Sequence, residues 1–126
     1  RAKTDPSLFS SSDLTKESSW KAMKDILSQK NRPTAVIAFN DYVALDAMQY
    51  VKRHTDLVIN KDICFVSYSN LPMRAYLDTP PLVSIEQFPY EQGRKATEML
   101  MAVMNGEALE TRQVVLDGEL ISLTEE

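Results

Sequence analysis

Hydrophobic residues recur along the chain with two spacings that alternate from one segment to the next. In residues 13–29 they recur every three or four positions, which predicts an amphipathic helix that Thr15 can cap. Residues 34–39 form a short and almost wholly apolar run, which is typical of a strand buried on both faces. The helical spacing returns in residues 42–53 and predicts a second helix there.

The same alternation continues through the second half of the chain. A helix is predicted at residues 90–104, and Asn105-Gly106 suits its left-handed C-terminal end. The remaining predicted elements are strands at residues 63–68, 82–85, 112–116 and 119–123 and a short helical turn at 71–77.

Strands that alternate with helices predict an α/β fold. Right-handed connections between such elements give a doubly wound, mainly parallel sheet with helices on both of its faces. In sheets of this kind, ligands bind at the carboxyl ends of the strands. The polar residues that follow each predicted strand are therefore the first candidates for a functional site.

Polar pairs follow three of the predicted strands: Asn40-Asp41, Ser69-Asn70 and Glu86-Gln87. Asn, Asp and Ser also cap helices and form turns, and for any single pair this is the more common role. The occurrence of all three pairs at one edge of the sheet favours a shared binding site. Both interpretations remain open at the level of the sequence.

Composition and charge narrow the class of protein. The 126 residues are 44% hydrophobic and 25% charged, which predicts one globular domain that needs no disulfide or metal. The net charge of -4 comes from 14 basic and 18 acidic residues that are interspersed, which argues against a nucleic-acid surface. The sequence has no apolar run long enough to span a membrane, and we expect a cytoplasmic protein.

The sequence offers little for catalysis or metal binding. It contains no Gly-rich phosphate loop, no Gly-x-Ser-x-Gly elbow and no His-Glu-x-x-His motif. Cys64 lies in an apolar run, where we expect a small buried hydrophobe, and His54 lies at a helix end, where we expect a solvated side chain. We therefore predict no enzyme activity, no cofactor and no metal.

A set of short segments carries a resemblance to a known family. They are TKESSWKAM at residues 15–23, RPTAV at 32–36, ND at 40–41, VSYSN at 66–70, SIEQ at 84–87 and YEQGRKA at 90–96. In this order and spacing, the chain from Leu14 to its end resembles the effector-binding core of the LacI/GalR (lac-repressor) family of bacterial transcription regulators.

The resemblance implies a periplasmic-binding-protein-like core of type I, which is incomplete in this chain. Such a core has two α/β subdomains joined by three crossovers, and a small effector binds in the cleft between them. Residues 1–87 would supply most of the C-terminal subdomain, residues 88–117 would cross to the N-terminal subdomain, and residues 118–126 would return. The chain starts at Arg1 without an initiator methionine, and we expect a DNA-binding module upstream.

The resemblance also implies which residues line the cleft: Leu14, Asn40, Asp41, Ser69 and Gln87. Many relatives have an aromatic ring at the position of Leu14 and two aspartates at Ser69-Asn70. A hydrogen bond to a charged group contributes about 1.5 to 3 kcal/mol, against about 0.5 to 1.5 kcal/mol for a neutral one. Ser69 is therefore expected to bind a hydroxyl group more weakly, or to recognise a different group.

The function implied by the resemblance is allosteric control of DNA binding. A small-molecule effector, most simply a carbohydrate, would bind here and change how a homodimer presents separate N-terminal DNA-binding heads. Leu45 and Tyr76 resemble subunit-interface positions, although both also suit an ordinary local core. The alternative function is that of a periplasmic sugar-binding protein of a transport system, which shares the fold.

Overall fold

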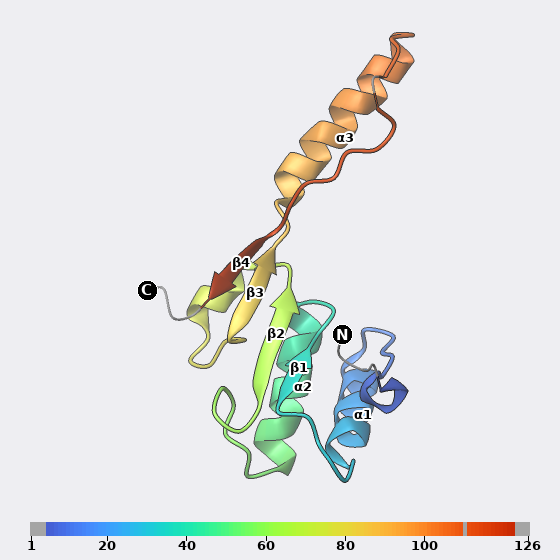
Figure 1. Cartoon of the computed structure of the whole chain (residues 1–126). Coiled ribbons are helices and arrows are strands. Elements are labelled where there is room, and N and C mark those ends of the chain that lie inside the picture. The colour runs from blue at the N-terminus through green and yellow to red at the C-terminus, as the bar shows by residue number, and fades with distance from the viewer. Residues whose placement is uncertain (1–4, 110, 123–126) are drawn as a thin grey trace.

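The computed structural model describes residues 5–109 and 111–122, and their strands form one four-stranded sheet (Figure 1). The strand order is β1-β2-β3-β4, with the first three parallel and the fourth antiparallel to β3. The predicted mainly parallel sheet is confirmed. The strands are β1 (Ala35–Ile37), β2 (Cys64–Tyr68), β3 (Val83–Glu86) and β4 (Glu119–Ser122).

The first two α-helices begin where the sequence offers capping side chains. The Thr15 hydroxyl accepts a hydrogen bond from the Ser18 backbone N–H, and the Asn40 side chain accepts one from the Val43 N–H. The helical elements are α1 (Lys16–Leu27), α2 (Asp41–His54), α3 (Pro89–Met104) and the short 3₁₀ helices η1 (Pro6–Leu8) and η2 (Pro72–Tyr76).

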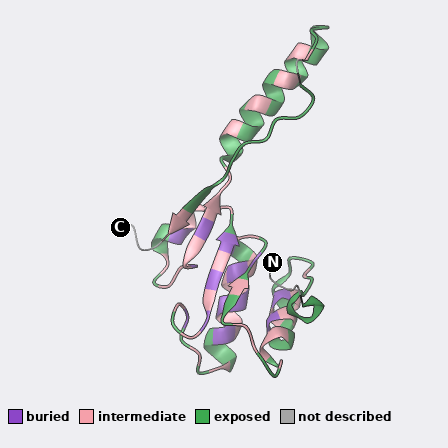
Figure 2. Cartoon of the chain, in the orientation of Figure 1, coloured by how far each residue is buried: buried purple, intermediate pink, exposed green. Residues whose placement is uncertain are grey.

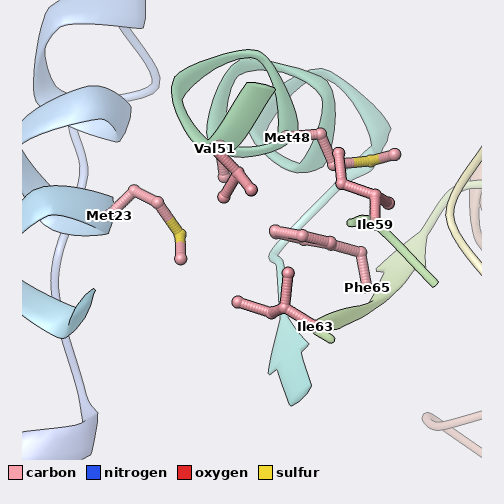
Figure 3. Packing of buried hydrophobic residues seen from close by; sticks show 7 residues of the cluster. Met23, Met48, Val51, Ile59, Ile63 and Phe65 are labelled. Atoms are coloured by element: carbon pink, nitrogen blue, oxygen red, sulfur yellow. The ribbon is translucent and has the colours of Figure 1, made fainter. Parts of the chain in front are cut away.

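The hydrophobic core lies between helices α1 and α2 and the face of the sheet that they cover (Figure 2). Met23 comes from α1, Met48 and Val51 from α2, and Phe65 from β2, and these side chains converge with Ile59 and Ile63 (Figure 3). These residues face inward because apolar positions recur at helical spacing on α2 and because alternate residues of β2 point to the covered face of the sheet.

Strand β1 is covered on one face only by the described residues. Ala38 is buried under the helices, whereas Ile37 is 73% exposed and Phe39 is 75% exposed on the opposite side. The prediction that residues 34–39 are buried on both faces is therefore wrong for this chain. An apolar run predicts burial but cannot say which neighbour will cover each face.

Helix α3 and residues 111–117 project away from the sheet (Figure 1). No residue of α3 is buried, although its apolar positions follow helical spacing. The strand predicted at residues 112–116 does not form, because no described strand lies beside it to pair with its backbone. Leu123, the last residue of the final predicted strand, lies outside the described residues.

One buried carboxylate connects the carboxyl ends of the strands. Asp41, the first residue of α2, is 2% exposed, and its Oδ1 accepts hydrogen bonds from the hydroxyls of Ser67 on β2 and Ser84 on β3. Its Oδ2 accepts a hydrogen bond of 2.6 Å from the Leu71 backbone N–H. Both serines are fully buried, and the Asn70 N–H donates to the Ser84 hydroxyl at 3.0 Å. Asp41 thus fixes α2, β2, β3 and the loop after β2 relative to one another.

The core predicts a position-dependent cost of removing one methyl group. Ile63→Val should lower the free energy of unfolding by about 0.5 to 1.5 kcal/mol, because Ile63 is fully buried. The same change at exposed Ile37 should alter it by less than about 0.5 kcal/mol. Urea denaturation of both variants measures this difference, and equal losses would contradict the described core.

The Asp41 network predicts a larger effect. Asp41→Ala leaves a backbone N–H and two buried hydroxyls without their acceptor, and each such group costs about 1 to 3 kcal/mol. We expect the free energy of unfolding to fall by at least about 2 kcal/mol. Asp41→Asn, which keeps one acceptor oxygen, should lose less. Asp46→Ala on the same helix is the matched control, since the Asp46 carboxylate makes no hydrogen bond to the described residues, and an equal loss there would refute the assignment.

Candidate functional site

A cavity of about 530 Å³ lies where the sequence predicted a site, at the carboxyl ends of β1, β2 and β3. Its walls come from the segment before α1, the end of β1, the end of β2 and the crossover after β3. The lining residues are Ser10, Ile37, Ala38, Phe39, Asn40, Tyr68, Ser69 and Gln87.

Three of the five predicted cleft residues line this cavity: Asn40, Ser69 and Gln87. The Asn40 Oδ1 atom is engaged at the start of α2, at 2.9 Å from the Val43 N–H, which leaves its Nδ2 group as a donor. The side chains of Ser69 and Gln87 make no hydrogen bond to other described residues and are available to a ligand. Asn40 therefore combines the two roles that the sequence left open, since it both caps a helix and faces the cavity.

The other two predicted residues lie elsewhere. The Asp41 carboxylate faces inward to Ser67, Ser84 and the Leu71 N–H, and it does not line the cavity. Leu14 has a left-handed backbone with φ of 69° and borders a different groove, of about 460 Å³, between α1 and β1. Direct contact of these two residues with an effector stays a prediction.

Two aromatic side chains of the cavity were missed from the sequence. Phe39 is the second residue after β1, and Tyr68 is the last residue of β2, so each directly precedes one of the polar pairs that the sequence singled out. Their position at the strand ends was the available signal. None of the described lining residues is charged. Aromatic rings together with amide and hydroxyl groups suit a neutral ligand that has an apolar face and hydrogen-bonding groups.

Glu86 directly precedes the cavity residue Gln87 but does not itself line the cavity. Its Oε2 accepts a hydrogen bond of 3.0 Å from the Asn70 amide, and its Oε1 accepts one of 2.7 Å from the Phe88 backbone N–H. These bonds, that of Asn70 above all, hold the pKa of the Glu86 carboxyl below its ordinary value. The carboxylate is therefore ionised at neutral pH and can accept both hydrogen bonds.

The remaining candidate residues show no sign of catalytic or metal chemistry. His54 is exposed, and its ring stacks on Tyr50 with centroids 4.4 Å apart, while Cys64 is half-buried. Within the described residues, no group of three or more His, Cys, Asp or Glu side chains is placed to hold a metal ion. Over the same part of the chain, no helix has both the length and the apolarity to cross a membrane.

The two predicted interface residues differ in their surroundings. Leu45 is half-buried and packs against the hydrophobic core, whereas Tyr76, at the end of η2, is 88% exposed. The ordinary core role that the sequence left open therefore applies to Leu45. Their position in a dimer stays a prediction.

Comparison with known proteins agrees with this architecture. The family model described as periplasmic binding protein-like domain matches residues 3–122. The HTH-type transcriptional repressor CytR of Escherichia coli strain K12 is 34% identical over 117 residues, which are 93% of this chain and 34% of the repressor. The HTH-type transcriptional repressor PurR of Aliivibrio salmonicida is 29% identical over 94% of this chain and 35% of the repressor. The chain thus spans about a third of the length of these curated relatives.

Solved structures give the same result. A regulatory protein of the LacI family from Chloroflexus aggregans is 32% identical with a TM-score of 0.76, over 89% of this chain and 40% of that one. The transcriptional regulator CelR in complex with cellobiose is 26% identical with a TM-score of 0.83, over 94% of this chain and 36% of that one. The chain therefore belongs to the periplasmic binding protein-like domain family, and along most of its length it is similar to LacI-family transcription regulators.

Proposed function

We propose that this chain is the effector-binding part of a LacI-family transcription regulator. The observation that carries the proposal is the cavity in which Asn40, Ser69 and Gln87 meet, each from the carboxyl end of a different strand. Curated relatives described as transcriptional repressors favour a regulator over a periplasmic sugar-binding protein. DNA would be bound by a separate N-terminal head, and this chain would control that head without making or breaking a bond.

The proposed effector is a neutral small molecule, with a carbohydrate as the first candidate. Phe39 and Tyr68 offer aromatic surface to the apolar face of a sugar ring, while Asn40 and Gln87 offer amide groups to its hydroxyls. The cellobiose bound by the similar regulator CelR supports this class. Ser69 would make a neutral hydrogen bond where the resemblance implies an aspartate in many relatives, so that single contact would contribute less.

The proposed division of the chain is the one that the resemblance to the LacI/GalR family implies, and the burial pattern supports it. Residues 1–87 would form most of one subdomain, 88–117 would pack on a second subdomain, and 118–126 would return to the first. No described residue of 88–117 is buried, although Leu100 and Val103 are large apolar side chains that favour burial. An effector held between the subdomains would favour one relative arrangement of them, and the dimer would transmit this change to DNA.

Effector binding is tested on the full-length regulator by a thermal-shift screen of sugars, sugar phosphates and nucleosides. We expect a stabilising shift with a neutral compound, since ligand at 100 times its dissociation constant adds about 2.7 kcal/mol of stability. In calorimetry with that compound, Gln87→Ala should raise Kd by about 2- to 12-fold, which corresponds to one neutral hydrogen bond.

The matched control for this measurement is Gln49→Ala, because Gln49 lies on α2 and does not line the cavity. Its Kd should equal that of the unmodified protein. The absence of a shift with every compound, or equal effects of the two substitutions, would count against the proposed site.

Homodimerisation is tested by sedimentation of the full-length regulator. Tyr76→Asp places a charge at the proposed interface and should weaken dimer association at least about tenfold, or about 1.4 kcal/mol. Val58→Asp, at an exposed apolar residue in the loop between α2 and β2, should leave association unchanged. A monomeric unmodified protein, or equal effects of both substitutions, would overturn the interface assignment.

A further inference from the structure

Four groups beside the cavity form a chain of hydrogen bonds that all run toward Glu86. The Arg74 guanidinium donates to Asn70 Oδ1 at 3.3 Å, and Asn70 Nδ2 donates to Glu86 Oε2 at 3.0 Å. The Phe88 backbone N–H donates to Glu86 Oε1 at 2.7 Å. These groups come from η2, the loop after β2, the end of β3 and the crossover to α3, respectively.

Chemistry fixes the direction of this chain. A guanidinium can only donate, and an ionised carboxylate can only accept, so the Asn70 amide must direct its oxygen to Arg74 and its nitrogen to Glu86. Arg74 is itself held in place, because it is only 9% exposed and its second terminal nitrogen donates to the Pro81 carbonyl at 3.0 Å. A rotation of the Asn70 amide by 180° would place its NH₂ group against the Arg74 guanidinium, and both of these groups are hydrogen-bond donors.

This series of hydrogen bonds lies next to the cavity and at the base of α3. Asn70 follows the cavity residue Ser69, and Glu86 precedes the cavity residue Gln87. Ser69, Asn70 and Phe88 all have left-handed backbones, with φ of 105°, 49° and 52°. This conformation is uncommon for non-glycine residues and least favourable for bulky ones such as phenylalanine, so contacts with the surroundings must stabilise it. The hydrogen bonds to Asn70 and Phe88 therefore help to hold both segments in their observed conformations.

Residues 118–119, where the chain returns to the sheet, lie beside Glu86. Glu86 pairs with Glu119 in the antiparallel register of β3 and β4. A Cβ atom on Gly118 would lie 3.0 Å from the Glu86 carbonyl oxygen, so the two passes of the chain are in close contact there. Figure 1 shows both passes side by side between the sheet and α3. Glu86 thus lies at the junction of both crossover segments.

We propose that Glu86 is a positioning residue that couples the cavity loop at residues 69–71 to the crossover at Phe88. A rearrangement of the loop would break or reorient the Asn70 bond, and the Phe88 turn that sets the direction of α3 would respond. This inference rests on the proposed function in one respect, namely that the cavity holds the effector. The coupling itself belongs to the ligand-free protein and can be measured there.

The test is residue-resolved amide hydrogen exchange of the ligand-free, full-length regulator. In E86Q, the new amide at position 86 opposes one of its N–H groups to that of Asn70 or Phe88. In N70D, two carboxylates oppose each other. Each single variant should increase exchange at least fivefold at the Leu71 N–H and at the Phe88 N–H together, and leave the amide of buried Val51 on α2 unchanged.

The double variant N70D/E86Q should restore exchange at both amides to within twofold of the unmodified protein. Its new carboxylate at position 70 can accept from Arg74 and from the amide at position 86, whose oxygen can accept from Phe88. The matched control is E119Q, which removes the same charge from the neighbouring strand and should change neither amide. A purely structural role of Glu86 would not produce this rescue.

Three results would overturn the inference. In the first, E86Q affects Phe88 alone, so that Glu86 only caps the crossover. In the second, the double variant exchanges as fast as the single variants or faster. In the third, exchange at Val51 rises as much as at Leu71, which is a general loss of stability. None of these measurements contains a ligand, so their failure is distinguishable from failure of the effector screen.

Discussion

The arrangement of the site depends on the hydrogen bonds of one buried carboxylate. Asp41 accepts from side chains of β2 and β3 and from the backbone of the loop between β2 and η2. A carboxylate removed from water must find donors within the protein, and here the donors come from separate segments. The hydrogen bonds of Asp41 therefore help to place Asn40 and Ser69 in the lining of the cavity, although neither of these residues bonds to Asp41.

Charge and binding surface are separated at this end of the sheet. The described cavity residues are neutral, whereas the carboxylates of buried Asp41 and half-buried Glu86 bind other protein groups, each one residue away from a lining side chain. The acidic groups near the cavity thus hold backbone segments in place, and the uncharged lining suits the neutral effector proposed above.

The exposed apolar surfaces of this chain are ones that a longer protein can cover. Ile37 on β1, Phe39 just after it, and Leu100 and Val103 on α3 are exposed in this structure, although large apolar side chains favour burial by about 1.5 to 3 kcal/mol each. Relatives about three times as long contain further elements, and the proposed two-subdomain core would bury such surfaces. The crossover at Glu86 connects the part of the chain that has its own core to the part that has none.

Local chemistry in the sequence determined most elements, since helical spacing and the caps Thr15 and Asn40 act between near neighbours. The prediction of a strand at residues 112–116 was wrong, because a strand forms only beside a second strand that pairs with its backbone. The spacing of apolar residues within one segment does not reveal whether such a partner is present. Because ligands bind at the carboxyl ends of parallel strands, the sequence predicted that Asn40, Ser69 and Gln87 would share one site, and all three line one cavity. Only the tertiary structure decided that Asn40 faces this cavity and Asp41 the interior, because successive residues at a helix start point in different directions and packing selects between them.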